Sequence, residues 1–234
     1  MTRERSFVLV PGAGGSAWYW HRLVDELVGR GHRALAVALP AADPDSGLSD
    51  YGRVIADAIR SVQRPVTLVA QSLGGFSAPL ACTRVAVEDL VLLNAMIPLP
   101  GETAGEWWAD VGWEAAAQEA ARREGRPPVD LNDVATVFFH DLPEEIVAFM
   151  ESNPDAAQES GKVFGEPWPL DRWPEVPTTV LAGAEDRLFP VDLQRRVARE
   201  RLGLPVEVVP GGHLAALSQP VSLAAALCPE GAAG

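Results

Sequence analysis

The sequence predicts an α/β domain with a mostly parallel, six-stranded sheet that carries helices on both faces. Three observations indicate this fold class. Short apolar, β-branched runs alternate with longer segments of helical spacing. Several runs are apolar at nearly every position, which is typical of parallel strands buried on both faces. The alternation stops over residues 98–173 and then resumes, so 234 residues suit one domain with an insertion.

The elements follow one another in a regular order. The expected strands are residues 6–10, 33–38, 66–70, 89–93, 178–182 and 206–209. The expected helices are residues 18–30, about 49–62, a helix that begins near Phe76, residues 191–201 and residues 220–227. Gly31 suits the position just after a helix end. Residues 98–173 hold five tryptophans between proline breakers and predict a helical insertion, which leaves 1–97 and 174–234 as the core.

The formal net charge of −13 disfavours nucleic acid and anionic membranes as partners. Cys82 and Cys228 form no metal-binding or redox pattern, so we expect two free thiols and no bound metal. The apolar run near the N-terminus is too short for a signal peptide, and no segment is long enough to span a membrane. A cytoplasmic protein is therefore expected.

Ser72 stands at the break between a buried strand and a helix. A sharp turn there needs small residues two positions before and after the serine, and Ala70 and Gly74 meet that need. Such a turn presents the hydroxyl as a nucleophile. The alternative is a strand–helix turn with a capping serine.

A serine nucleophile needs a base and an acid at the carboxyl ends of the same parallel strands. His213 is the histidine that follows the last predicted strand. Asp186 follows the preceding strand and is the preferred acid, with its neighbour Glu185 as the fallback. The alternative for this acidic pair is the cap region of the next helix. We expect the N–H groups of Leu73 and Ala13 to bind the oxyanion.

The sequence resembles the small α/β-hydrolases of the plant methylesterase and hydroxynitrile lyase type and their bacterial esterase relatives. Four segments carry the resemblance: residues 7–20, 71–75, 185–186 and 212–220. It implies the α/β-hydrolase fold, a Ser-His-Asp triad and a cap formed by the helical insertion. The residues that it implies for substrate binding are Gly12, Trp107, Trp108, Phe138, Phe139, Leu142 and Leu214. Each aromatic or leucine of the cap could equally be cap core.

Two departures from the family pattern bear on the reaction. Pro11 replaces a histidine that usually follows the first strand, which leaves the Ala13 N–H available. Gly12 and Leu214 stand where the lyases carry a threonine and a lysine. The resemblance therefore favours the esterase branch.

We expect a cofactor-independent serine esterase that acts on a small, uncharged or aromatic ester. The lyase reaction and a ligand-binding homologue with little catalysis are the alternatives on the same fold. A dinucleotide-dependent oxidoreductase is less favoured: residues 12–17 fit G-x-G-x-x-A, but no acidic residue ends the second strand near Leu39. The Tyr-x-x-x-Lys pair of such enzymes is also missing, since no tyrosine precedes Lys162 by four positions. The oligomeric state is open, with a homodimer as one option.

Trp18 and Trp20 are expected to pack their helix against the core, and His140 to make a structural hydrogen bond.

Overall fold

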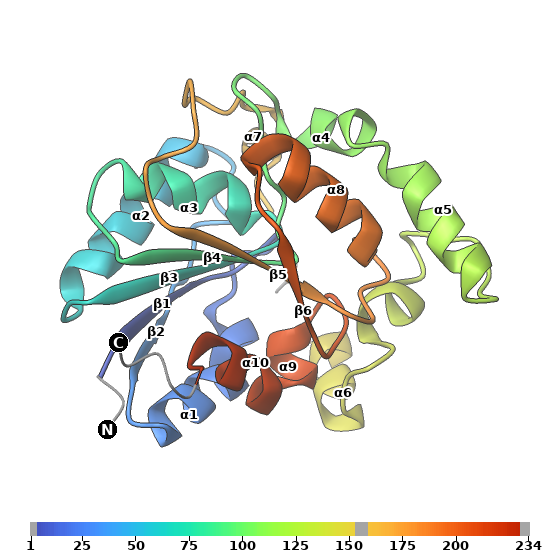
Figure 1. The fold of residues 1–234 in the computed structure, drawn as a ribbon, viewed down its shortest axis with the longest axis horizontal. Helices are drawn as coiled ribbons and strands as arrows, with labels where there is room; N and C mark the ends of the chain where they lie inside the picture. The colour runs from blue at the N-terminus through green and yellow to red at the C-terminus, as the bar shows by residue number, and fades with distance from the viewer. Residues whose placement is uncertain (1–3, 153–158, 230–234) are drawn as a thin grey trace.

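The computed structural model describes residues 4–152 and 159–229. Its sheet has six parallel strands in the order β2-β1-β3-β4-β5-β6 (Figure 1). The strands are β1 (Ser6–Val10), β2 (Arg33–Ala36), β3 (Val66–Gln71), β4 (Asp89–Leu93), β5 (Thr178–Gly183) and β6 (Val206–Val209). All six predicted strands are thus confirmed, with bounds within two residues of those expected. Because the strands are parallel, their carboxyl ends lie along one edge of the sheet.

Helices cover both faces of this sheet (Figure 1). One face carries α2 (Leu48–Ser61), α3 (Gly74–Cys82) and α8 (Val191–Leu202). The other carries the 3₁₀ turn η1 (Ala17–Trp20), α1 (His21–Gly29), α9 (Ala215–Ser218) and α10 (Pro220–Leu227). Gly31 has φ +83° and ends the first helical segment, as predicted.

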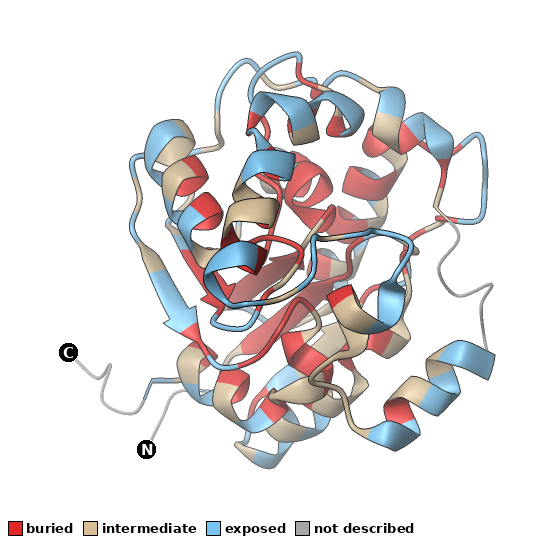
Figure 2. Cartoon of the chain, turned by 90° about the vertical axis from the view of Figure 1, so that its right-hand side faces the viewer, coloured by how far each residue is buried: buried red, intermediate tan, exposed pale blue. Residues whose placement is uncertain are grey.

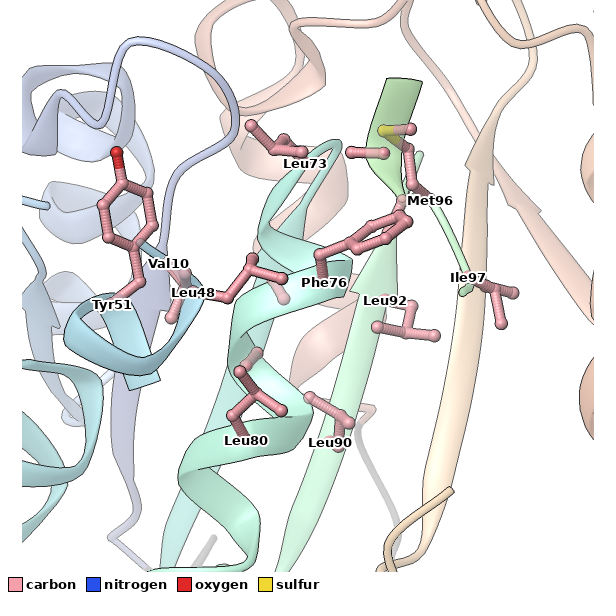
Figure 3. Close-up of a cluster of buried hydrophobic side chains, with 14 of the residues drawn as sticks. Val10, Leu48, Tyr51, Leu73, Phe76, Leu80, Leu90, Leu92, Met96 and Ile97 are labelled. Atoms are coloured by element: carbon pink, nitrogen blue, oxygen red, sulfur yellow. The ribbon is translucent and has the colours of Figure 1, made fainter. Parts of the chain in front are cut away.

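The period of two along each strand divides the core into two clusters. In β1, Val8 and Val10 join the cluster under α2 and α3, whereas Phe7 and Leu9 join the cluster under α1 and α10. Figure 2 shows the buried colour concentrated in the strands and on the inner sides of the helices. In the first cluster, Phe76 and other apolar side chains of α3 lie against those of β4 (Figure 3). These clusters fix the position of the strand ends.

The segment between β4 and β5 is helical in its described part, as predicted. It contains α4 (Ala104–Asp110), α5 (Trp113–Arg123), the π-helical turn η2 (Ala135–Phe139), α6 (Glu144–Ser152) and α7 (Gly161–Gly165). Residues 153–158 of this segment lie outside the described residues. Three of its tryptophan side chains donate hydrogen bonds to main-chain carbonyls: Trp107 to Ile97, Trp113 to Leu188 and Trp168 to Phe76. These three buried tryptophans therefore hold the segment against the sheet domain.

Within the described ranges, no helix combines the length and apolar character that crossing a membrane requires.

Candidate active site

Ser72 lies in the tight turn between β3 and α3. Its backbone has φ +52°, a left-handed conformation that is uncommon for a residue with a side chain. The turn admits only small neighbours: a Cβ on Gly74 would lie 2.9 Å from the Pro11 carbonyl oxygen. On Gly75 it would lie 1.9 Å from that of Met96. The strained, tightly enclosed turn presents Ser72 at the carboxyl end of β3, where a nucleophile elbow places its serine.

His213 and Asp186 meet at the same edge of the sheet. The imidazole Nδ1 lies 2.9 Å from Asp186 Oδ2, and both side chains are almost completely buried. The other oxygen of the carboxylate, Oδ1, accepts the N–H groups of Leu188 and Phe189 at 2.8 and 2.9 Å. These bonds hold Asp186 in an orientation that places the proton of neutral His213 on Nδ1. Nε2 is then left as the basic nitrogen.

Glu185, the alternative acid, hydrogen-bonds the main chain of another residue. Its carboxylate accepts the N–H of Gly211 at 2.6 Å, and the residue is exposed. Asp186 is therefore the acid that this structure pairs with the histidine.

The main chain of His213 is tied to the residue beside Ser72. The Gln71 side chain donates to the His213 carbonyl oxygen at 3.2 Å and accepts the Gly12 N–H at 3.1 Å. Asn94, which follows β4, also donates to the His213 carbonyl oxygen, at 3.2 Å. Among the described residues no hydrogen bond joins Ser72 Oγ to His213, and ligand-free catalytic sites often hold such groups apart until substrate binds. The buried amides nevertheless bring the histidine loop, the Gly12 loop and the elbow together.

Three further buried amides of the site, those of Gln71, Asn94 and Gln194, were not predicted from the sequence. Gln194 in α8 donates to the carbonyl oxygen of Phe189 at 2.7 Å and lies 3.5 Å from Asp186 Oδ2. Gln71 and Asn94 could have been found, since polar residues at the end of two apolar strands are unusual. The helical spacing around Gln194 contains no comparable signal.

Two backbone N–H groups near Ser72 are the predicted oxyanion donors. Those of Ala13 and Leu73 donate no hydrogen bond to any described residue. The Gly12 backbone passes so close to the elbow that a Cβ on Gly12 would lie 2.7 Å from Ser72 Cβ. The predicted donors thus flank the serine, from the loop after β1 and from the start of α3.

A cavity of about 360 Å³ opens beside these residues. Its lining is mostly apolar: Pro11, Gly12, Ala13, Ser16, Trp18, Tyr19, Gln71, Val134, Phe139, Phe149, Met150, Glu151, Leu214 and Leu217. Ser72 and His213 are not in this lining, whereas their chain neighbours Gln71 and Leu214 are. The indole of Trp18 stacks on the Phe149 ring with a centroid separation of 4.4 Å.

The predicted substrate-binding residues divide into two groups. Gly12, Phe139 and Leu214 line the cavity, and the Phe138 ring lies edge-on to the His213 imidazole at 5.6 Å. Trp107 and Trp108 pack against Phe189, and Leu142 packs in the core cluster under α1 and α10, so none of these three lines the cavity.

The structure differs from two further expectations, which concern Trp18 and His140. Trp18 lines the cavity instead of only packing its helix, because residues 17–20 form a 3₁₀ turn before α1. His140 Nε2 is buried with no hydrogen-bond partner among the described residues.

The glycine loop after β1 is poorly suited to a dinucleotide phosphate. The Gly12 N–H is occupied by Gln71, and the Gly14 N–H donates to the Glu159 carboxylate at 2.9 Å. A phosphate binds where such N–H groups are free, and a carboxylate in their place would repel it. In the part of the chain that the structure describes, no three His, Cys, Asp or Glu side chains cluster as a metal site would require.

Comparison with known proteins agrees with this geometry. The family model described as "Alpha/beta hydrolase family" matches residues 7–226. "Probable esterase PIR7A" of Oryza sativa subsp. indica is 37% identical over 112 residues, which is 43% of this chain and 43% of that protein. The chain thus matches less than half of this relative's length. "Methyl jasmonate esterase 1" of Vitis vinifera is 25% identical over 250 residues and 96% of each chain.

Among solved structures, a pyrethroid hydrolase from Sphingobium faniae JZ-2 superimposes with a TM-score of 0.75. It is 24% identical, with 96% of each chain covered, and this likeness concerns the fold alone. The predicted fold and the resemblance to plant esterases are confirmed. The chain belongs to the alpha/beta hydrolase family.

Proposed function

We propose that this protein is a serine hydrolase of carboxylic esters. The observation that carries the proposal is the buried His213–Asp186 pair, 2.9 Å apart, with His213 on a loop that the Gln71 side chain ties to the elbow of Ser72. A histidine oriented in this way is a general base for a neighbouring hydroxyl. The relatives named as esterases support the same reaction.

The roles follow from the positions of the groups. Ser72 Oγ attacks the ester carbonyl carbon while His213 Nε2 takes the hydroxyl proton. The carbonyl oxygen becomes an oxyanion and accepts the N–H groups of Ala13 and Leu73. Collapse of this intermediate breaks the bond to the alcohol, which leaves with the proton from His213. Water activated by the same imidazole then releases the acid and restores Ser72.

The cavity supports a small, uncharged and at least partly aromatic substrate. Among the described residues, its lining holds one carboxylate, Glu151, and no lysine or arginine. The stacked Trp18 and Phe149 rings offer an aromatic face. An anionic substrate would find no cationic side chain to pair with there.

The lining also bears on the lyase alternative. Gly12 and Leu214 both line the cavity, so neither position supplies a hydroxyl or an ammonium group. The lyase relatives use those two groups, as the family resemblance implies, and ester hydrolysis requires neither of them.

We propose further that residues 98–173 act as a cap over the site. Its described residues Val134, Phe139, Phe149 and Met150 line the cavity. The two free thiols, Cys82 and Cys228, support a reducing, cytoplasmic location.

Steady-state hydrolysis of p-nitrophenyl esters of graded acyl length tests the proposal. Ser72→Ala is expected to lower kcat/KM by roughly a thousandfold or more, because the nucleophile is lost. Ser61→Ala removes an exposed serine hydroxyl of α2 and serves as the matched control. Undiminished hydrolysis by the Ser72 variant would refute the triad. Absence of turnover by the wild-type protein, together with slow labelling by a fluorophosphonate, would favour the ligand-binding alternative.

A further inference from the structure

Both loops beside Ser72 are rich in glycine and need outside contacts to stay in place. Gly211 has φ +107° just before the base, and Gly14 and Gly15 have φ +86° and +59° after β1. Glycine backbones have more conformational freedom to lose than others, so such loops hold a position only when hydrogen bonds fix them. The amide of Gln71 provides one such bond to each loop from the sheet.

Asp141 fixes the loop of the base from the cap. Its Oδ2 accepts the N–H of Gly212, the residue before His213, at 2.6 Å. The Asp141 side chain is only 15% exposed, and a Cβ on Gly212 would lie 2.9 Å from Asp141 Oδ1. The contact is therefore tight, charged and largely shielded from water, which makes it stronger than a neutral surface hydrogen bond.

Glu159 fixes the oxyanion loop from the same segment. Its Oε2 accepts the Gly14 N–H at 2.9 Å, one residue beyond Ala13. Its Oε1 accepts the Tyr51 hydroxyl and the Ser160 N–H, so the carboxylate is held on both sides. Burial raises the pKa of Glu159.

We propose that Asp141 and Glu159 are positioning residues through which the cap holds the catalytic base and the oxyanion donors in place. This inference rests on the proposed ester hydrolysis. Each carboxylate reaches from the cap to the backbone of one active-site loop. The cap thus completes the geometry of the catalytic groups, in addition to lining the cavity.

A third cap carboxylate provides the matched control. Glu166 Oε2 accepts the N–H of Leu48 at 2.7 Å, where α2 begins. This contact also joins the cap to the sheet domain through a carboxylate and a backbone N–H. It does not involve either active-site loop. If cap carboxylates only stabilised the fold, all three would have the same effect on catalysis.

The experiment compares Asp141→Ala, Glu159→Ala and Glu166→Ala in the full chain with a p-nitrophenyl ester. Active sites are titrated, so that kcat refers to folded, competent enzyme, and Tm is measured in parallel. We expect all three variants to lower Tm. Only the first two should lower kcat, by roughly tenfold or more with KM changed by less than about threefold, because misplaced catalytic groups slow the chemical step.

Asp141→Asn keeps an acceptor for the Gly212 N–H and should recover most of the lost kcat. If Asp141→Ala does not fold, Asp141→Asn takes its place in the comparison. The kcat of Asp141→Asn is expected to be roughly threefold below wild type, because a neutral acceptor binds the Gly212 N–H less strongly than a carboxylate does. Values of kcat within twofold of wild type in the Asp141 and Glu159 variants would overturn the inference. A fall in kcat of the same size in the Glu166 variant would also overturn the inference. Activity that survives Ser72→Ala would instead overturn the proposed function.

Discussion

Asn94 links the fold to the candidate site, and its replacement should damage both. The residue is completely buried at the end of β4, with φ +46°. Its Nδ2 donates to the carbonyl oxygens of Gly212 and His213 at 3.0 and 3.2 Å. Its Oδ1 accepts the N–H of Gly183 at 2.7 Å. One amide therefore joins β4, β5 and the loop of the base.

Asn94→Ala removes these bonds without offering replacements. Leaving the buried Gly183 N–H and Gly212 carbonyl unpaired costs about 1–3 kcal/mol for each group, or about 2–6 kcal/mol together. In a protein of this size Tm falls by roughly 2–4 °C per kcal/mol, so a decrease of at least about 4 °C is expected. The backbone adds to the loss, since asparagine tolerates the left-handed region better than alanine does.

The assay is thermal unfolding followed by circular dichroism, with kcat measured on titrated active sites. Because the His213 carbonyl oxygen loses one of the two side-chain amides that donate to it, kcat should fall roughly tenfold or more. Asn132→Ala removes an exposed asparagine that bonds only within its own loop, and it should change neither quantity. A Tm within about 1 °C of wild type together with unchanged kcat would refute the role given to this amide network.

Three further predictions concern the triad, the cap and the cavity. Asp186→Asn should keep the fold but lower kcat by about 10⁴-fold, because the amide no longer selects the tautomer with a basic Nε2; equal rates would contradict that role. Burial, reinforced by Arg187, lowers the pKa of His140 below 6.5. As the pH falls, His140 is therefore protonated in the unfolded chain before it is protonated in the folded protein. The free energy of unfolding should fall as pH drops from about 7 through the pKa of folded His140. His140→Gln should show a smaller Tm difference between about pH 7 and pH 5, and an unchanged difference would count against this. Phe149→Ala should raise KM for aryl esters by roughly three- to tenfold and leave KM for alkyl acetates nearly unchanged, because the stacked face with Trp18 is lost. An equal change in KM for the two classes of ester would contradict this role of Phe149.

The elements of the sheet could be predicted because each strand is a short apolar run between polar or glycine-rich turns. The pairing of Asp186 with His213 could be predicted for a related reason. Parallel strands bring the loops at their carboxyl ends together, so chain order alone suggests which loops meet.

Contacts between distant segments could not be predicted in this way. Asp141 lies on a turn of the cap and Glu159 lies just before α7, and no spacing in the sequence relates them to Gly212 or Gly14. The same limit applies to Trp107, because a large aromatic side chain suits a pocket or a core equally well. Its indole N–H bonds the Ile97 carbonyl oxygen inside the core.

The most direct test of the account is to locate the covalent adduct formed with a fluorophosphonate, by peptide mass spectrometry, and to measure the rate of labelling. The adduct should form on Ser72, and His213→Ala should slow its formation by roughly a thousandfold, because the hydroxyl then has no base. An adduct on another residue, or equal labelling rates with and without the imidazole, would contradict the proposed catalytic serine and its base.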